Sequence, residues 1–369
     1  MNRLRELDFL RGTAILLVLF RHIPLFTFTK NLGWIGVDLF FVLSGFLISG
    51  ILFKEYIKHG NISAKLFLIR RGFKIYPIYY LFYLPYLFII LFEGRFNLLG
   101  FLADITFTQN YVWGWGYAQA ALWSLAVEEH FYLSFIFLLW LSQKKKWLKL
   151  AINEQTQNTL FSFQHIIITI LIICFVLRLA FNIYLPEEPT KLFTITHYRI
   201  DSLLMGVLIA YLYFFRFECF EKKFEAYRRQ LLAFAFFGLL WTPFIEPLPS
   251  FFAKTIGFTL LYMSFGSILT FFLMEKNINT LLDKIFTQKI VNMVSLIGYC
   301  SYSIYIIHTF AIYLSTKVFI NFQLYEANFS AYLFFVTAAS LSILAGILMT
   351  YRVEKYFLQI RNKYYPSRI

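Results

Sequence analysis

Of the 369 residues, 59% are hydrophobic, 21% are aromatic and only 15% are charged, whereas about 25% of a soluble domain is charged. This composition excludes a soluble globular domain and indicates an all-α protein that crosses a membrane several times. The net charge of +14 fits basic residues at a cytoplasmic membrane surface better than a nucleic-acid partner, and the three cysteines lack the paired spacing of disulfides or zinc sites.

Apolar segments long enough to cross a bilayer recur about ten times along the chain. We expect one membrane-spanning helix in each of ten ranges: 9–28, 33–53, 76–93, 121–141, 165–185, 198–215, 231–246, 253–274, 296–320 and 331–351. These helices would form a single transmembrane domain over residues 1–369, with its core at about 5–356, around a central polar cavity.

Lysines and arginines are unevenly distributed between the connecting segments. Most of the 34 fall in six clusters that would share one side of the membrane, at 3–11, 54–74, 144–149, 216–229, 276–289 and 352–368. Basic residues accumulate on the cytoplasmic side of membrane proteins. We therefore expect both termini to be cytoplasmic, which agrees with an even number of spans.

The first apolar segment carries two ionisable residues, Arg11 and His22, eleven positions apart. A helix advances about 100° and 1.5 Å per residue, so both lie on one face, roughly 16 Å apart along the axis. With Arg11 at a membrane surface, His22 would lie near the middle of the bilayer. An ionisable group there indicates a functional site. The alternative is a helix–helix hydrogen bond beside a kink at Pro24.

The second span and the following loop add further charges. Asp38 lies near the outer end of its span, where it should face an aqueous cavity or a cation. The small pair Ser44-Gly45 would allow close helix packing. Arg71 and Lys74 are one helical turn apart. They could bind an anionic lipid head group or the phosphates of a soluble cofactor, or could only reflect the basic cytoplasmic side.

The fourth span places Ser124, Glu128 and Tyr132 on one face, at i, i+4 and i+8. His130 faces differently from Glu128, and no second pair of ligands of that kind follows, so a metal site is not favoured. We expect Glu128 to be buried and hydrogen-bonded, orienting a histidine or a substrate hydroxyl.

Three later spans hold polar residues. Arg178 and Asn182 are one turn apart in the fifth span, and Arg199 and Asp201 open the sixth. Arg199 and Asp201 do not share a helix face, so we expect each to pair with another span. In the ninth span, Ser301, Tyr305 and His308 lie on one face, which gives a second intramembrane histidine lined by hydroxyls.

These residues occur in an order that resembles the type-3 membrane acyltransferases, which modify bacterial surface polysaccharides and related glycans. The resemblance covers about residues 5–356 and rests on six motifs: Arg11-x10-His22, Gly36-Val37-Asp38-Leu39-Phe40-Phe41 with Ser44-Gly45-Phe46, Arg71-x2-Lys74-Ile75-Tyr76-Pro77, Trp123-Ser124-Leu125-x2-Glu128 with Phe131-Tyr132, Arg199-x-Asp201-x4-Gly206, and Ser301-Tyr302-x2-Tyr305-x2-His308. Each motif alone is modest, but the ordered set is specific.

The resemblance implies about ten core helices, an acyl-CoA donor, no metal, and transfer of an acyl group, commonly acetyl, to a glycan hydroxyl. It also implies that Arg11 and His22 are essential. The implied location is the bacterial inner membrane, where the partners are membrane lipid and a surface glycan or glycolipid. Lipopolysaccharide, capsule, exopolysaccharide, peptidoglycan and small glycosides all remain open as acceptors.

The chain departs from the family pattern at three positions. Lys74 stands where the family has a second arginine, which keeps the charge but loses the bidentate fork. Lys355 replaces a frequent proline, and His130 a frequent glutamine. Some relatives carry a fused periplasmic esterase-like domain, which we expect this chain to lack.

The residues suggest a division of roles in acyl transfer, which needs a base, charge stabilisation and a grip on the donor. His22 is the expected base, or is itself acylated. We expect Arg11, Arg71 and Lys74 to hold the donor phosphates. Asp38 or Glu128 would orient His22, and His308 would take a second proton or bind the acceptor. The candidate substrate-binding residues are Ser124, Arg199, Asp201 and Tyr305.

A transporter or flippase is the rival class, because its spans would also contain buried charges along a polar path. Dependence on acyl-CoA distinguishes the two classes. A transporter should move its substrate without acyl-CoA and should not release free CoA.

Overall fold

The computed structural model describes residues 4–145, 163–324 and 330–368, and these residues form helices and no strands. The helices of the first half are α1 Arg5–His22, α2 Thr27–Gly33, α3 Gly36–His59, α4 Ala64–Phe92, α5 Leu98–Ile105, α6 Gln109–Val112, η1 Ala120–Leu122, α7 Trp123–Lys144 and α8 Phe163–Tyr184. Those of the second half are α9 Pro189–Thr194, α10 Thr196–Phe215, α11 Phe217–Leu239, η3 Ala253–Gly257, α12 Phe258–Met274, α13 Ile278–Phe286, α14 Gln288–Tyr299, α15 Ser301–Asn321, α16 Ser330–Met349, η5 Thr350–Glu354 and α17 Lys355–Tyr364.

Eight helical segments of the described residues are long and apolar enough to cross a membrane. They are Thr27–His59, Ala64–Phe92, Ala120–Lys144, Phe163–Tyr184, Pro189–Phe215, Ala253–Met274, Ser301–Asn321 and Ser330–Tyr364. The prediction of an all-α, multi-pass membrane protein is therefore confirmed. The helices α1 and α11 are not among the eight, because several charged residues interrupt the apolar sequence of each.

Several predicted boundaries were wrong, and each error has a physical reason. The helix α1 ends at His22, since Pro24 disfavours helical backbone at Ile23, and the short helix α2 follows. Arg71 and Lys74 lie inside α4, which begins at Ala64, and not in a loop. The predicted span 231–246 is the end of α11 followed by a turn, because a proline-rich stretch stops the helix at Leu239.

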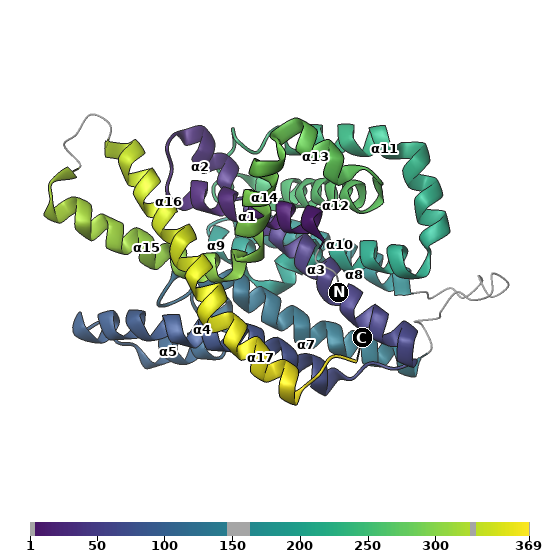
Figure 1. Ribbon diagram of the computed structural model, residues 1–369, viewed down its shortest axis with the longest axis horizontal. Helices are drawn as coiled ribbons and strands as arrows, with labels where there is room; N and C mark the ends of the chain where they lie inside the picture. The colour runs from purple at the N-terminus through teal and green to yellow at the C-terminus, as the bar shows by residue number, and fades with distance from the viewer. Residues whose placement is uncertain (1–3, 146–162, 325–329, 369) are drawn as a thin grey trace.

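The helices α3 and α10 form the closest pair in the middle of the molecule (Figure 1). Glycines make this contact possible from both sides. A Cβ atom at Gly45 would lie 1.9 Å from the carbonyl oxygen of Leu203, and one at Gly206 would lie 2.1 Å from that of Val42. Only residues without a side chain allow backbones to approach this closely.

The C-terminal helices cross the bundle as one long segment of α16, η5 and α17, drawn in yellow in Figure 1, and α17 packs against α4. The ring of Tyr365 lies 5.7 Å from that of Phe73 in a tilted arrangement, and the carbonyl oxygen of Tyr365 accepts a hydrogen bond from Arg70. Arg368 forms an ion pair with Glu55 on α3 at 2.7 Å. These contacts fix α17 over the start of α4.

The orientation in the membrane was inferred partly from Arg3, Lys146 and Lys149, which lie outside the described residues. The remaining basic residues of these clusters are described.

Candidate active site

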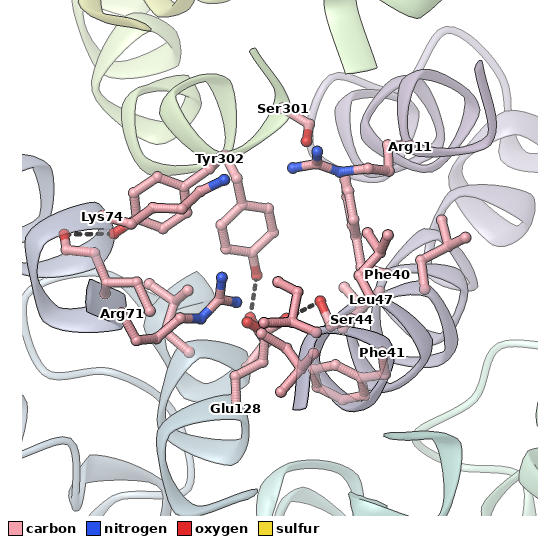
Figure 2. A pocket seen from close by; sticks show the side chains of 18 residues that line it. Arg11, Phe40, Phe41, Ser44, Leu47, Arg71, Lys74, Glu128, Ser301 and Tyr302 are labelled. Carbon is pink, nitrogen blue, oxygen red and sulfur yellow. Dashed lines mark hydrogen bonds between the residues drawn. The ribbon is translucent and has the colours of Figure 1, made fainter. Parts of the chain in front are cut away.

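One cavity lies between α1, α3, α4, α7 and α15 and has a volume of about 230 Å³. Three of the predicted donor-binding residues, Arg11, Arg71 and Lys74, line it together. Figure 2 shows Arg71 and Lys74 on one side of this cavity and Arg11 on the other. The helical spacing within α4 explains why Arg71 and Lys74 share a face. The fold thus collects cations from two distant parts of the sequence.

Hydrogen bonds hold Arg71 and Glu128 in fixed positions at this cavity. Arg71 donates to the hydroxyl of Tyr132 at 2.5 Å, and its guanidinium lies 4.5 Å from the centre of that ring. Tyr132 donates in turn to Glu128 at 2.5 Å, and Ser44 donates to the other oxygen of Glu128 at 3.0 Å. Glu128 is therefore hydrogen-bonded, as predicted, but it is only half-buried. It orients an arginine through Tyr132 and makes no described contact with His22.

The other two cations have carboxylates nearby. Lys74 lies 3.7 Å from Glu354, and Arg11 lies 3.8 Å from Asp8. Glu354 is only 6% exposed and also accepts a hydrogen bond from Ser303. The segment η5 thus turns Glu354 inward toward Lys74.

A hydrogen bond between two helices forms part of the cavity wall. The hydroxyls of Ser124 on α7 and Tyr305 on α15 lie 2.6 Å apart, and Tyr305 also donates to the carbonyl of Ala121. Both side chains line the cavity, whereas His308, one turn further along α15, does not. The ring of Tyr305 lies 5.5 Å from that of His308, so this bond connects the cavity wall to His308.

Two histidines meet beyond this bond. The rings of His22 and His308 lie edge to face with their centres 4.8 Å apart. The Nδ1 atom of His22 lies 2.9 Å from the carbonyl oxygen of Val18, and that of His308 lies 2.6 Å from that of Tyr305. A carbonyl only accepts, so each Nδ1 donates and each neutral ring keeps an unprotonated Nε2.

The two histidines differ in their access to the surroundings. His308 is completely buried, and its Nε2 has no hydrogen-bond partner among the described residues. His22, the last residue of α1, is exposed. An exposed base beside a buried one can receive a molecule from outside the bundle. Neither histidine lines the cavity, whose nearest lining residue to the pair is Tyr305, with its ring 5.5 Å from that of His308.

Asp38 does not orient His22, contrary to the expectation that Asp38 or Glu128 would do so. It is fully buried, pairs with Arg199 at 2.7 Å and accepts a hydrogen bond from Ser202 at 3.0 Å. The Arg199 guanidinium also lies 3.8 Å from the centre of the Phe258 ring. Asp38 thus faces a cation, as predicted from the free-energy cost of an unpaired carboxylate in a membrane. The pair joins α3 to α10 and does not contact His22.

The assignment of Arg199 and Asp201 to substrate binding does not fit the structure. Both are 0% exposed, and neither lines the cavity. Asp201 pairs with Arg178 on α8, which also donates to Thr259 on α12. The prediction that Arg199 and Asp201 pair with other spans is confirmed. These residues join four helices and stabilise the wall of the site.

Comparison with known proteins agrees with this arrangement. A family model described as an acyltransferase domain matches residues 4–351. The chain belongs to the type-3 membrane acyltransferase family. The acyltransferase match contains every residue of the cavity and both histidines.

Two relatives of the acyltransferase have informative names. Peptidoglycan O-acetyltransferase OatA of Listeria monocytogenes is 29% identical over 229 residues, which cover 56% of this chain and 34% of that protein. A Staphylococcus aureus protein named "Putative O-acetyltransferase" is 27% identical over 394 residues, covering 100% of this chain and 61% of its own length. The chain thus spans between one third and three fifths of these curated relatives. No solved structure matches it.

Sequence reasoning missed the partners of the cations in this acyltransferase. Tyr132 was placed on the face of Glu128, but its bond to Arg71 crosses from α7 to α4. His130 lies away from the cavity, with its Nδ1 atom 2.7 Å from the hydroxyl of Thr196. The helical period identifies residues that share a face, but it does not show which neighbouring helix that face contacts.

Proposed function

We propose that this acyltransferase moves an acyl group, most simply acetyl, from cytoplasmic acyl-CoA to a hydroxyl of a cell-envelope glycan. The observation that carries this proposal is the order of the groups along the site. Three cations and the hydrogen-bonded pair Ser124–Tyr305 line one cavity. The ring of Tyr305 neighbours that of His308, which lies against His22.

The donor would bind at the cationic end of the cavity. Guanidinium groups bind phosphate oxygens through charge-assisted hydrogen bonds, and an ammonium acts as a point charge. Arg11 and His22 are roughly 16 Å apart along α1, a separation that the extended pantetheine arm of CoA can span. The thioester would then meet the histidine pair while the CoA phosphates stay with Arg11, Arg71 and Lys74.

His22 would act as the general base through its Nε2. The acceptor hydroxyl gives its proton to that nitrogen as its oxygen bonds to the thioester carbonyl carbon. The carbon–sulfur bond then breaks, and the CoA thiolate takes the proton. This leaves an ester and free CoA. His308 would share the proton during transfer, because its ring lies 4.8 Å from that of His22 and its Nε2 has no other partner among the described residues.

The acceptor would approach from the exposed side of His22, opposite to the donor. The name of the Listeria relative supports a peptidoglycan acceptor, and the general class is a glycan hydroxyl. The basic clusters support a bacterial inner-membrane location with cytoplasmic termini and donor cavity. With the donor bound on the cytoplasmic side and the acceptor on the opposite side, the protein could transfer an acyl group from a cytoplasmic donor to a glycan outside the cell.

The direct test is release of CoA thiol from acetyl-CoA by the purified protein in lipid nanodiscs, with a cell-wall glycan mixture as acceptor. We expect release that depends on the acceptor and is lost in His22→Ala and Arg11→Ala. The matched controls are His197→Ala and Arg352→Ala, which remove an exposed histidine and an exposed arginine. Thermal unfolding would confirm that all variants fold.

Two outcomes would contradict the proposal. Full thiol release by a folded His22→Ala variant would exclude His22 as the base. Movement of a labelled glycan across proteoliposomes without acyl-CoA, and with no thiol released, would favour a transporter.

A further inference from the structure

The cations of this protein do not end at the cavity. Arg361 on α17 lies within electrostatic range of Arg70, Arg71 and Lys74. The contacts of Tyr365 with α4 explain the position of Arg361. Arg361 precedes Tyr365 by one helical turn, and the carbonyl of Arg361 accepts a hydrogen bond from the N–H of Tyr365. Arg361 is not among the residues that line the cavity. It lies on α17, which packs against α4, the helix that contributes Arg71 and Lys74 to the cavity.

This cluster, Arg70, Arg71, Lys74 and Arg361, contains more positive than negative charge. Glu354 is the carboxylate that acts on both Lys74 and Arg361. The side-chain hydrogen bonds of Arg361 go only to the amide oxygen of its neighbour Asn362, among the contacts of the described residues. Like charges gathered in one place repel each other, and a bound anion relieves that repulsion.

The size of the cavity indicates which part of a donor would reach this cluster. A pocket that encloses a drug-sized molecule typically has a volume of roughly 300–1,000 Å³. The cavity, at about 230 Å³, is smaller, and CoA is larger than most drugs. The cavity therefore accommodates the acyl and pantetheine end, and the nucleotide end must lie outside it, next to the cations Arg71 and Lys74.

We propose that Arg361 binds the 3′-phosphate of the donor nucleotide, an inference that rests on the proposed acyl-CoA dependence. The diphosphate would occupy Arg71 and Lys74, and the 3′-phosphate is the remaining anionic group of CoA. A phosphomonoester carries nearly two negative charges and suits the guanidinium fork. The protein would then discriminate acyl-CoA from a thioester that lacks this phosphate, including one on a phosphopantetheine carrier protein.

The test compares acetyl-CoA with acetyl-3′-dephospho-CoA in the wild type, Arg361→Gln and the matched control Lys363→Gln. Lys363 is exposed on the same helix and is not part of the cluster, so its replacement removes an equal charge without changing the cluster. In Arg361→Gln we expect KM for acetyl-CoA to rise by roughly tenfold to 100-fold, since a charge-assisted hydrogen bond is lost. The KM for the dephospho donor and kcat should not change.

Arg361→Lys should restore part of the preference because it keeps the charge. All measurements use nanodiscs of neutral lipid and, in parallel, nanodiscs with one third anionic lipid. An Arg361→Gln effect that appears only with anionic lipid would assign this arginine to a lipid head group and overturn the proposal.

Equal weakening of both donors in Arg361→Gln would also overturn it, because the arginine would then only position α4. Calorimetric binding of CoA and dephospho-CoA, without turnover, separates this failure from failure of the proposed function. Binding of CoA with no discrimination removes the role of Arg361 alone. If the folded wild type binds neither nucleotide, both the proposed use of acyl-CoA as donor and the role of Arg361 are refuted.

Discussion

Replacement of Asp38 by asparagine tests whether this carboxylate stabilises the fold or takes part in the reaction. The amide of the new side chain would keep an oxygen that accepts from Arg199 and Ser202, so the shape of the site is conserved. The Arg199 guanidinium would lose its paired charge while remaining 0% exposed beside the ring of Phe258. The change therefore isolates the charge of the pair.

Breaking a buried ion pair by removing one partner costs about 3–5 kcal/mol. Asparagine still accepts hydrogen bonds, so we expect the free energy of unfolding to fall by about 3 kcal/mol in Asp38→Asn. The measurement is reversible unfolding in mixed micelles with increasing sodium dodecyl sulfate. In the double variant Asp38→Leu/Arg199→Met, most of the loss should be recovered, because apolar residues can replace a buried pair at little cost.

The control is Glu188→Gln, which breaks the exposed pair with Lys191, whose side chains are 42% and 47% exposed. Its effect should stay below about 1 kcal/mol. If Asp38→Asn unfolds like this control but releases no thiol, the reasoning is refuted. Asp38 would then act in the reaction, and its pairing with Arg199 would be secondary.

Three further predictions concern other parts of the structure. His308→Ala should lower thiol release by roughly 100-fold or more while CoA binding stays unchanged; unaltered turnover would exclude a role for the histidine pair beyond His22. Glu246 forms a forked ion pair with Arg21 that holds the pKa of Glu246 below its ordinary value. That pair should stabilise the fold above about pH 4.5, and the gain, less than about 1 kcal/mol in so exposed a pair, should disappear as pH falls through the folded pKa. Thermal midpoints between pH 7 and 3 should therefore decline less in Glu246→Gln, and parallel curves would contradict this. Gly206→Ala should destabilise the protein by roughly 1–3 kcal/mol, because its Cβ would lie 2.1 Å from a backbone oxygen of α3. A stability equal to wild type in the unfolding assay would contradict this, because α3 and α10 would then move apart for the added methyl group at no cost.

The residues that line the cavity could be predicted from the sequence because their chemistry is exceptional in an apolar chain. Arg11, Arg71 and Glu128 each cost free energy in a membrane, so each had to face a polar region or a partner. The helical period then placed neighbours such as Lys74 on the same face. Their meeting in one cavity follows from these two constraints together with the order of the spans.

The partners of the buried charges could not be predicted in the same way. Asp38 and Arg199 are 161 positions apart, and nothing in the local pattern distinguishes Arg199 from Arg178 as the partner of Asp38. The outcome depends on which helices pack together, and this is decided by small residues such as Gly45 and Gly206. Long-range packing therefore determines whether a buried carboxylate supports the fold or the chemistry.

The ends of the helices were predicted less well than their centres. The basic residues around Arg71 resemble a cytoplasmic loop in composition, yet α4 continues through them from Ala64. A helix can extend beyond the hydrocarbon region into water, and hydropathy does not detect that part. Its extension is what brings Arg71 and Lys74 into the cavity.

The close packing of α3 and α10 also limits how this protein can move. Two glycine contacts and the Asp38–Arg199 pair fix the two helices against sliding, since any shift would separate buried charges or force backbone atoms to collide. Alternating access in transporters requires one bundle to rock against another around a central site. Here α3 and α10 are held together, so opening of the cavity must come from the other helices that line it, α1, α4, α7 and α15.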